Sequence, residues 1–365
     1  MREMMESAWY NPSAAYGEAV RVEKIIAGAR AAVAGALGVD GAEIVFTGGG
    51  TEADSLALLG AAARLRGPGR VLLFAGEHPA VLETAAQLAA MGHRVETVPA
   101  TEAGVLDLAA LSRMLEEGVD LVSCMQVNNE TGAVQPVAEI AKRTKEKNPQ
   151  ALLHVDGAQG FLRLPLNVRG EGVDLYTVSS HKVHGPKGVG ALYVRKDVKL
   201  LPQLLGGGQE AGLRSGTENT AGIAGFGAAV AWMLEQAGGV ARLRGLKLRL
   251  YEQLRNNIEG LRVNGPGPET EEAAPHILSV SFPGVGGEVM LHALEAEGVL
   301  VGTGAACSSK KRGMSAAFQA MAAPKWAADS AVRFSFGLFN TEEDVDNAAE
   351  AVVRCYGRYK AFQRR

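Results

Sequence analysis

The sequence predicts an α/β fold, with a mostly parallel, mixed sheet in a large domain and a smaller α+β domain after it. Two observations support this. Up to about Gly238, short apolar and β-branched runs alternate with longer helical patterns, which is typical of parallel strands joined by covering helices. After that point a charged helical stretch and a Gly/Pro-rich loop interrupt the alternation. We therefore expect a large domain at 11–238 and a small domain at 239–365, a division that the length of 365 residues permits.

The large domain is expected to contain seven strands with helices between most of them. The strand candidates are 43–47, 70–75, 94–98, 120–127, 151–155, 173–179 and 189–195. The helical stretches are 52–66, 80–91, 108–117 and 137–146. The last strand follows its predecessor after a Gly-rich link that is too short for a helical crossover, so we expect these two strands to be antiparallel.

The small domain is expected to mix helices and strands without regular alternation. In chain order its elements are a helix at 240–259, a loop from Asn264, a strand at 277–282, a helix near 287–297, a Gly-rich loop at 302–304, a strand at 331–336 and a final helix at 341–356.

Composition excludes several classes of protein. Lys and Arg total 37 and Asp and Glu total 40, so the net charge is −3, which gives no support to nucleic-acid binding through bulk basic charge. Hydrophobic residues make up 47% of the chain, which excludes a disordered protein. Neither a signal peptide nor an apolar run long enough to cross a membrane is visible. We expect neither nucleic acid nor membrane as a partner.

The chain contains 3 cysteines, Cys124, Cys307 and Cys355. So sparse and odd a set forms neither a disulfide framework nor a CxxC metal site, so a cytoplasmic location and no metal are expected. Cys124 lies in an apolar strand and is expected in the core. Cys355, in the last helix, is structural or on the surface. Cys307, in a Gly-rich loop, is by itself equally compatible with a filler and a nucleophile.

Polar side chains follow four of the predicted strands. They begin at Thr47 (Thr-Gly-Gly-Gly-Thr-Glu), Asn128 (Asn-Asn-Glu), Asp156 (Asp-Gly-Ala-Gln) and Ser179 (Ser-Ser-His-Lys). Because ligands of such sheets bind beyond the carboxyl ends of the strands, we expect these clusters to converge on one site.

The chemistry of these clusters is that of a pyridoxal 5'-phosphate site. Residues 48–51 offer backbone N–H groups at a helix N-terminus, where phosphate binds, although such a turn alone is equally well only a turn. Asp156 is a carboxylate able to pair with a protonated ring nitrogen, and Lys182 is an amine able to form a Schiff base. Anchor, acid and lysine are together what this cofactor needs.

The chain resembles the cysteine desulfurases of the class V aminotransferase family, pyridoxal-phosphate enzymes of fold type I. The resemblance runs from about Asn11 to the last helix and rests on seven motifs in the family's order. They are Glu43-Ile-Val-Phe-Thr-Gly-Gly-Gly-Thr-Glu-Ala-Asp, Glu77-His-Pro-Ala-Val, Val127-Asn-Asn-Glu-Thr-Gly, His154-Val-Asp-Gly-Ala-Gln, Ser179-Ser-His-Lys-Val-His-Gly-Pro-Lys-Gly, Gly206-Gly-Gly-Gln-Glu-Ala-Gly-Leu-Arg-Ser-Gly-Thr and Gly304-Ala-Ala-Cys-Ser-Ser.

The resemblance implies a role for each matching residue. Lys182 would bind the cofactor covalently and act as the base, while His78 would stack on the ring and take part in proton transfer. Asp156 would pair with the ring nitrogen and Gln159 with the phenolic oxygen. The phosphate would be held by Gly50, Thr51, Ser179 and His181, and by Thr217 from the neighbouring subunit of a homodimer.

The resemblance also implies the reaction. Asn129 and Arg333 would bind the carboxylate of L-cysteine. Cys307 would attack the substrate's sulfur, become a persulfide and leave L-alanine as product. The sulfur would then pass to an unidentified acceptor protein and supply iron–sulfur clusters, thio-cofactors or tRNA. The cationic run at 310–312 (Lys310, Lys311 and Arg312) would lower the pKa of the thiol. It is open whether that run also docks the acceptor or is only a solvated loop.

The chain also departs from the family pattern. The family's usual opening, a short strand leading into Asp-Asn-Ala-Ala-Thr-Thr, is missing, and the chain starts at what would be the following helix. Two alternatives therefore stay open. One is a selenocysteine lyase or another pyridoxal-phosphate enzyme of β-elimination or transamination. The other is a reduced, non-catalytic homologue that lacks the opening segment.

Overall fold

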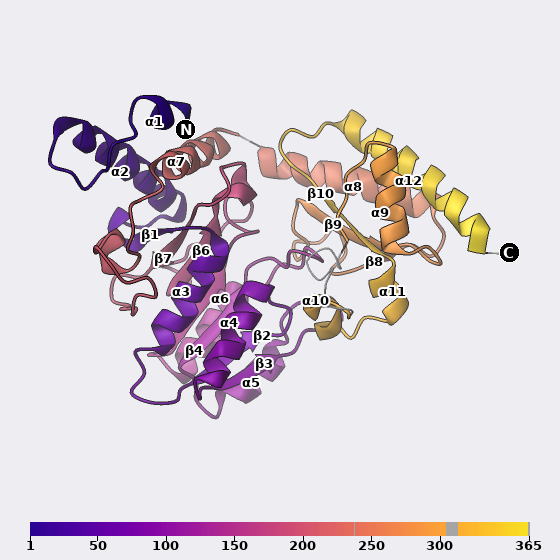
Figure 1. Cartoon of the computed structure of the whole chain (residues 1–365). Helices are drawn as coiled ribbons and strands as arrows, with labels where there is room; N and C mark the ends of the chain where they lie inside the picture. The colour runs from indigo at the N-terminus through magenta and orange to yellow at the C-terminus, as the bar shows by residue number, and fades with distance from the viewer. Residues whose placement is uncertain (237, 304–312, 364–365) are drawn as a thin grey trace.

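The computed structural model describes residues 1–236, 238–303 and 313–363 (Figure 1). Its larger part is built around a seven-stranded sheet. Its strands are β1 (Ile44–Thr47), β2 (Arg70–Phe74), β3 (Arg94–Val98), β4 (Leu121–Met125), β5 (Leu152–Asp156), β6 (Leu175–Ser179) and β7 (Gly190–Val194). All seven expected strands are confirmed, and β5 runs one residue further than expected, to Asp156. The predicted α/β class is therefore confirmed.

The sheet has the order β1-β7-β6-β5-β4-β2-β3. Strands β2 to β6 pair in parallel, and β7 is antiparallel to β6, as the short link between them predicts. Strand β7 is also antiparallel to β1, so β1 runs in the same direction as β6. Consequently the carboxyl ends of β1, β4, β5 and β6 all lie at one edge of the sheet.

Helices cover both faces of this sheet. On one face lie α3 (Gly50–Ala62) and α4 (Pro79–Ala90), whose apolar side chains share a core with Val71 and Leu73 of β2. The opposite face, which includes Leu72 and Phe74, packs against α2 (Gly17–Leu37), α5 (Leu108–Leu115), α6 (Val137–Lys147) and α7 (Thr220–Glu235). The helices α1 (Arg2–Glu6), α2 and α7 were not among the helices expected from the pattern. Helix α7 contains an uninterrupted apolar run, residues 222–234, and packs against α2.

A second, three-stranded antiparallel sheet has the order β10-β9-β8. Its strands are β8 (Arg262–Val263), β9 (Ile277–Ser281) and β10 (Ala331–Ser335), and its helices are α8 (Gly239–Asn257), α9 (Gly287–Ala296), α10 (Ala316–Ala320), α11 (Lys325–Asp329) and α12 (Glu342–Gln363). Figure 1 shows α8, α9 and α12 gathered around this sheet, beside the larger one. The short elements β8, α10 and α11 were not predicted, because so few residues show no period.

Three short 3₁₀ turns complete the structure: η1 (Gly41–Glu43), η2 (Ser180–Val183) and η3 (Glu210–Gly212). Within the described part of the chain, every helix is too short or too polar to span a membrane.

Gly190 brings the turn after β1 next to the end of β6. Its register partners are Thr47 in β1 and Ser179 in β6, so it lies between the last residues of both strands. A Cβ atom at Gly190 would lie 2.7 Å from the carbonyl carbon of Gly49 and 2.7 Å from the carbonyl oxygen of Val178. Only glycine allows this approach of three backbone segments.

We expect Gly190→Ala to destabilise the protein by about 2 kcal/mol, because backbone atoms on both sides would have to move. Gly245→Ala is the matched control: Gly245 is exposed in α8, and a Cβ atom added there would meet no atom of the described residues within 4 Å. It should stabilise the protein by up to about 1 kcal/mol through helix propensity. Urea unfolding of both variants measures the difference, and equal effects would contradict the role given to Gly190.

Candidate functional site

The turn between β1 and α3 borders a cavity of about 750 Å³. The cavity is lined by the Gly48–Thr51 turn, by Ser179 and His181 beyond β6, and by Arg214. Helix α3 begins at Gly50, and no described side chain caps it, so the amides of its first turn are available to an anion. The structure thus brings four residues predicted to bind phosphate to one cavity: Gly50, Thr51, Ser179 and His181.

One amide of this turn differs from the expectation. The Gly48 N–H, predicted to be free, donates to Oε2 of Glu52 at 2.9 Å. Glu52 lies in the first turn of α3 and reaches back to cap the backbone that precedes it. A Cβ at Gly50 would lie 3.4 Å from Cβ of Ser179, an ordinary van der Waals contact, so the start of α3 lies directly beside the end of β6.

The two polar side chains after β6 contact one another. Ser179 Oγ and His181 Nδ1 are 3.0 Å apart. The pKa of His181 is lowered, first by burial and then by the charges of Lys182 and Lys187. At neutral pH the imidazole is therefore uncharged and can exchange hydrogen bonds with a phosphate oxygen.

Asp156, the last residue of β5, is a buried carboxylate. Its Oδ1 accepts a hydrogen bond from the Ala158 amide at 2.9 Å. Its pKa is raised to about 7, first by burial and next by the nearby charge of Asp54. A protonated ring nitrogen beside this carboxylate would supply the positive charge that favours its ionised form, so Asp156 fits the cofactor.

His78 is the N-cap residue of α4, and its Nδ1 accepts a hydrogen bond from the Ala80 amide at 3.1 Å. Burial lowers its pKa, while the charge of Asp156 raises it and that of Lys182 lowers it again. The neutral imidazole has an aromatic face and one ring nitrogen that the Ala80 amide does not engage.

Two residues that sequence reasoning missed support the remaining cofactor positions. Arg163 is buried and donates to the main-chain carbonyl of Lys182, in η2. His276, to which the sequence assigned no role, lies with Nε2 3.2 Å from Oε1 of Gln159. Both come from segments without a polar cluster at a strand end, so no pattern in the sequence drew attention to them.

The two residues predicted to bind the substrate carboxylate come together from the loop after β4 and from β10. Arg333 of β10 donates from Nη1 to the main-chain oxygen of Asn129 at 2.7 Å. Its backbone exchanges two hydrogen bonds with Gly302, at 2.7 and 2.9 Å. Ser315 Oγ donates to Oε2 of Glu130 at 2.7 Å, which makes a second link between the two parts of the chain.

Other predicted residues are not brought into the site. Thr217 is exposed and does not line the cavity with Gly50 and Ser179. Cys307 and the cationic run at 310–312 lie outside the described residues. Cys124 and Cys355 are both buried, and the core position expected for Cys124 is confirmed. Within the described ranges, no group of three His, Cys, Asp or Glu side chains is placed to hold a metal ion.

A buried polar layer lies behind Asp156, on the sheet face that α3 covers. His154 of β5 has Nδ1 2.9 Å from Ser123 Oγ and Nε2 3.1 Å from Thr177 Oγ1. Asp54 of α3 places Oδ1 3.5 Å from the same Nε2. Burial lowers the pKa of His154 to about 4 and raises that of Asp54 to about 7. His154 is therefore a neutral, packed strand residue.

Glu77, directly before His78, adds a third acid to this compartment. Burial raises its pKa well above the usual range, and the charges of Asp156 and Asp54 raise it further. Three acids in one dry compartment cannot all be ionised together at low cost. Of the three, Asp156 is the last residue of β5, at the edge of the sheet where that strand ends.

Comparison with known proteins gives one consistent result. The family model for class V aminotransferases matches residues 1–348. A cysteine desulfurase from a Nostoc species is 36% identical over 353 residues, covering 96% of this chain and 87% of that protein. A solved structure described as a NifS-like protein has a TM-score of 0.89 and 34% identity, covering 97% of this chain and 93% of the other. A structure of SspA in complex with cysteine has a TM-score of 0.81 and 30% identity, with 93% and 94% covered.

We expect Asp54→Asn to reduce the loss of stability of the cofactor-free protein as pH rises. The pKa of Asp54 is raised from 3.8 to about 7, so folding favours its protonated form. Its contribution to stability is fully present below the unfolded pKa and is lost as pH rises through about 7. The neutral amide avoids a loss on the order of 3 kcal/mol between pH 4 and pH 7.

Urea unfolding at several pH values measures this change. The control is Asp197→Asn, the same substitution at an exposed position of the chain. It should leave the pH dependence as it is in the unmodified protein. If Asp54→Asn behaves like this control, Asp54 is not the buried acid described above.

Proposed function

We propose how this protein, which belongs to the class V aminotransferase family and within it to the cysteine desulfurases, converts L-cysteine to L-alanine. Its cofactor is pyridoxal 5'-phosphate. The observation that carries the residue assignment is that Gly50, Thr51, Ser179 and His181 line one cavity at the edge of the sheet where the neighbouring strand β5 ends in Asp156. When bound, the cofactor draws electrons from the substrate's α-carbon and so weakens its C–H bond.

In this proposal each residue of the ring site has one task. Lys182 would hold the cofactor covalently, and its amine would take the α-proton of the substrate. Asp156 in its ionised form would keep the ring nitrogen of the cofactor protonated. His78 would pack on the ring, and its neutral imidazole would move a proton at the substrate's sulfur. Gln159, held by His276, donates from its amide nitrogen to the phenolic oxygen.

In this proposal the phosphate and the substrate carboxylate are bound by two different sets of residues. Gly50, Thr51, Ser179 and His181 bind the phosphate, together with Thr217 of the partner subunit in a homodimer. The guanidinium of Arg333 and the side chain of Asn129 bind the carboxylate of L-cysteine. A related protein, SspA, has been solved in complex with cysteine, which supports L-cysteine as the substrate here.

Sulfur transfer needs no external oxidant or reductant. The thiolate of Cys307 forms a bond to the sulfur of the substrate, and the bond between that sulfur and the substrate's β-carbon breaks. The electron pair of the broken bond remains on the carbon side, which takes up a proton and leaves as L-alanine. Cys307 keeps the sulfur as a persulfide. Lys310, Lys311 and Arg312 favour the thiolate by their charge.

We extend the proposal to the setting of the enzyme. The chain divides into the domains 11–238 and 239–365, the protein works in the cytoplasm, and a separate acceptor protein takes the persulfide sulfur. We propose that this sulfur is supplied to iron–sulfur cluster assembly.

The test is to incubate purified protein with L-cysteine and measure L-alanine and protein-bound persulfide. We expect Cys307→Ala to lower alanine formation by at least about 100-fold, because the nucleophile is gone, while the visible absorption of bound cofactor is unchanged. Cys355→Ala, at a buried cysteine of α12, is the control and should keep its activity.

Three outcomes would contradict the proposal. Normal turnover by Cys307→Ala would remove Cys307 as the nucleophile. Efficient cleavage of selenocysteine, but not of cysteine, would identify a selenocysteine lyase. Bound cofactor without any turnover would identify a non-catalytic homologue.

A further inference from the structure

Two adjacent residues in η3 adopt a backbone conformation that side chains disfavour. Glu210 has φ 50° and Ala211 has φ 55°, both in the left-handed region, although neither is glycine. Each such residue costs about 1–2 kcal/mol relative to the right-handed conformation. Contacts elsewhere must hold this turn in place, and the side chain of Glu210 makes them.

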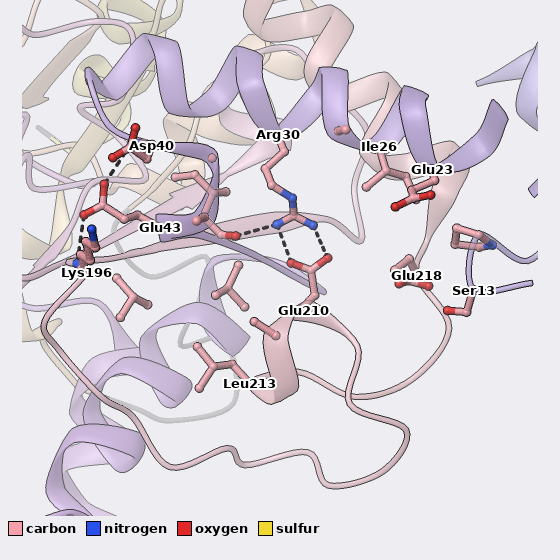
Figure 2. Close-up of a pocket in the computed structure, with 18 of the residues that line it drawn as sticks. Ser13, Glu23, Ile26, Arg30, Asp40, Glu43, Lys196, Glu210, Leu213 and Glu218 are labelled. Atoms are coloured by element: carbon pink, nitrogen blue, oxygen red, sulfur yellow. Dashed lines mark hydrogen bonds and ion pairs between the residues drawn. The ribbon is translucent and has the colours of Figure 1, made fainter. Parts of the chain in front are cut away.

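Glu210 is clamped by a half-buried arginine and by the backbone of β1. Arg30 of α2 donates from Nη1 and Nη2 to its two carboxylate oxygens, at 2.7 and 2.6 Å (Figure 2). The Phe46 amide donates to Oε2 at 2.8 Å. Arg30 also donates to the Ile44 carbonyl at 2.6 Å and lies over the ring of Phe46, 4.7 Å from its centroid. Only 3% of the Glu210 side chain is exposed.

These contacts reach the phosphate turn from the side of β1. Phe46 is followed by Thr47, the last residue of β1, and then by Gly48, where the turn begins. The amide of Phe46 is therefore fixed by Glu210 two residues before the turn. Figure 2 shows Glu210 pointing from its loop toward Arg30 of α2, and both side chains line a cavity of about 890 Å³.

The same segment also reaches the turn from the side of α3. Arg214, four residues after Glu210, donates from Nε to Oε1 of Glu52 at 2.9 Å. Glu52 in turn accepts from the Gly48 amide through Oε2. Two contacts therefore hold the phosphate turn. Glu210 binds the amide of Phe46, two residues before the turn, and the Arg214–Glu52 pair binds the amide of Gly48, its first residue.

We propose that Glu210 is a positioning residue for the phosphate seat: through Arg30 and the Phe46 amide it fixes the segment 204–218 and the end of β1 in the arrangement that presents the Gly50 and Thr51 amides to phosphate. The proposal rests on the proposed function, because it takes this turn as the seat of the cofactor's phosphate. Glu210 does not touch the ligand itself. It acts through the backbone it holds.

The test compares the affinities of pyridoxal 5'-phosphate and of pyridoxal for the full-length apoprotein. Both can react with Lys182, but only the first has a phosphate, so the ratio of their dissociation constants isolates the phosphate seat. We expect Glu210→Gly, which suits a positive φ but removes the clamp, to weaken binding of the phosphorylated form about tenfold. Binding of pyridoxal should change by less than about twofold. Arg30→Met should act in the same direction.

Glu43→Gln is the matched control. Glu43 lines the same cavity, pairs with Arg169, and has an equally buried side chain, 3% exposed. Its hydrogen bonds go to Arg169, Lys196 and Asp40, away from the phosphate turn. The ratio of the two dissociation constants should therefore stay at the value of the unmodified protein.

The outcomes separate this inference from the proposed function. If the unmodified protein binds neither compound at Lys182, the proposed function fails. If it prefers the phosphorylated form and Glu210→Gly keeps that preference, or weakens both ligands equally, the positioning role is wrong. Should Glu210→Gly not fold, Glu210→Gln, which keeps an acceptor for the Phe46 amide but loses the charge, should shift the ratio about threefold. An unchanged ratio in that variant would overturn the inference.

Discussion

The position of β7 between β1 and β6 is the constraint on which the rest of the site depends. This antiparallel strand turns β1 so that its carboxyl end faces the same edge as the ends of β4, β5 and β6. Gly190, in the middle of the three strands, allows their backbones to meet without a side chain between them. Without this arrangement the turn after β1 would not lie beside Ser179. Strand order and close backbone packing therefore place the anion-binding turn, and the polar residues act only once that placement exists.

The polar residues at the edge of the sheet fall into an exposed group and a buried group. Helix amides, Ser179 and His181 line an open cavity. Asp54, Glu77 and Asp156 are buried near His154; burial raises the pKa of the three acids and lowers that of the histidine. A buried charge is stable only opposite another charge. A protonated ring nitrogen can provide that opposite charge for Asp156, because Asp156 lies where β5 ends.

Much of this could be predicted from the sequence, because strand ends in a parallel sheet meet at one edge and carry recognisable residue types. Asp156, Ser179 and the glycine turn are of this kind. The residues that escaped prediction act through long-range contacts: Arg163 on Lys182, His276 on Gln159, and Glu210 on Phe46 are separated by many residues in the chain. The pairing of β1 with β7 was also not evident, since it joins strands with five others between them in sequence. Local patterns do not encode such partners.

The raised pKa of Asp156 has a consequence for how the protein acquires its cofactor. Because burial raises this pKa to about 7 before the site is filled, the carboxyl holds its proton at a much higher pH than an exposed aspartic acid does. That proton has to depart before the carboxylate can face a positively charged ring. Filling the site is therefore also an exchange of protons with the solvent, and mildly acidic surroundings oppose it. The carboxyl of Asp156 is therefore a weaker acid in the apoprotein than it is once a positively charged ring faces it.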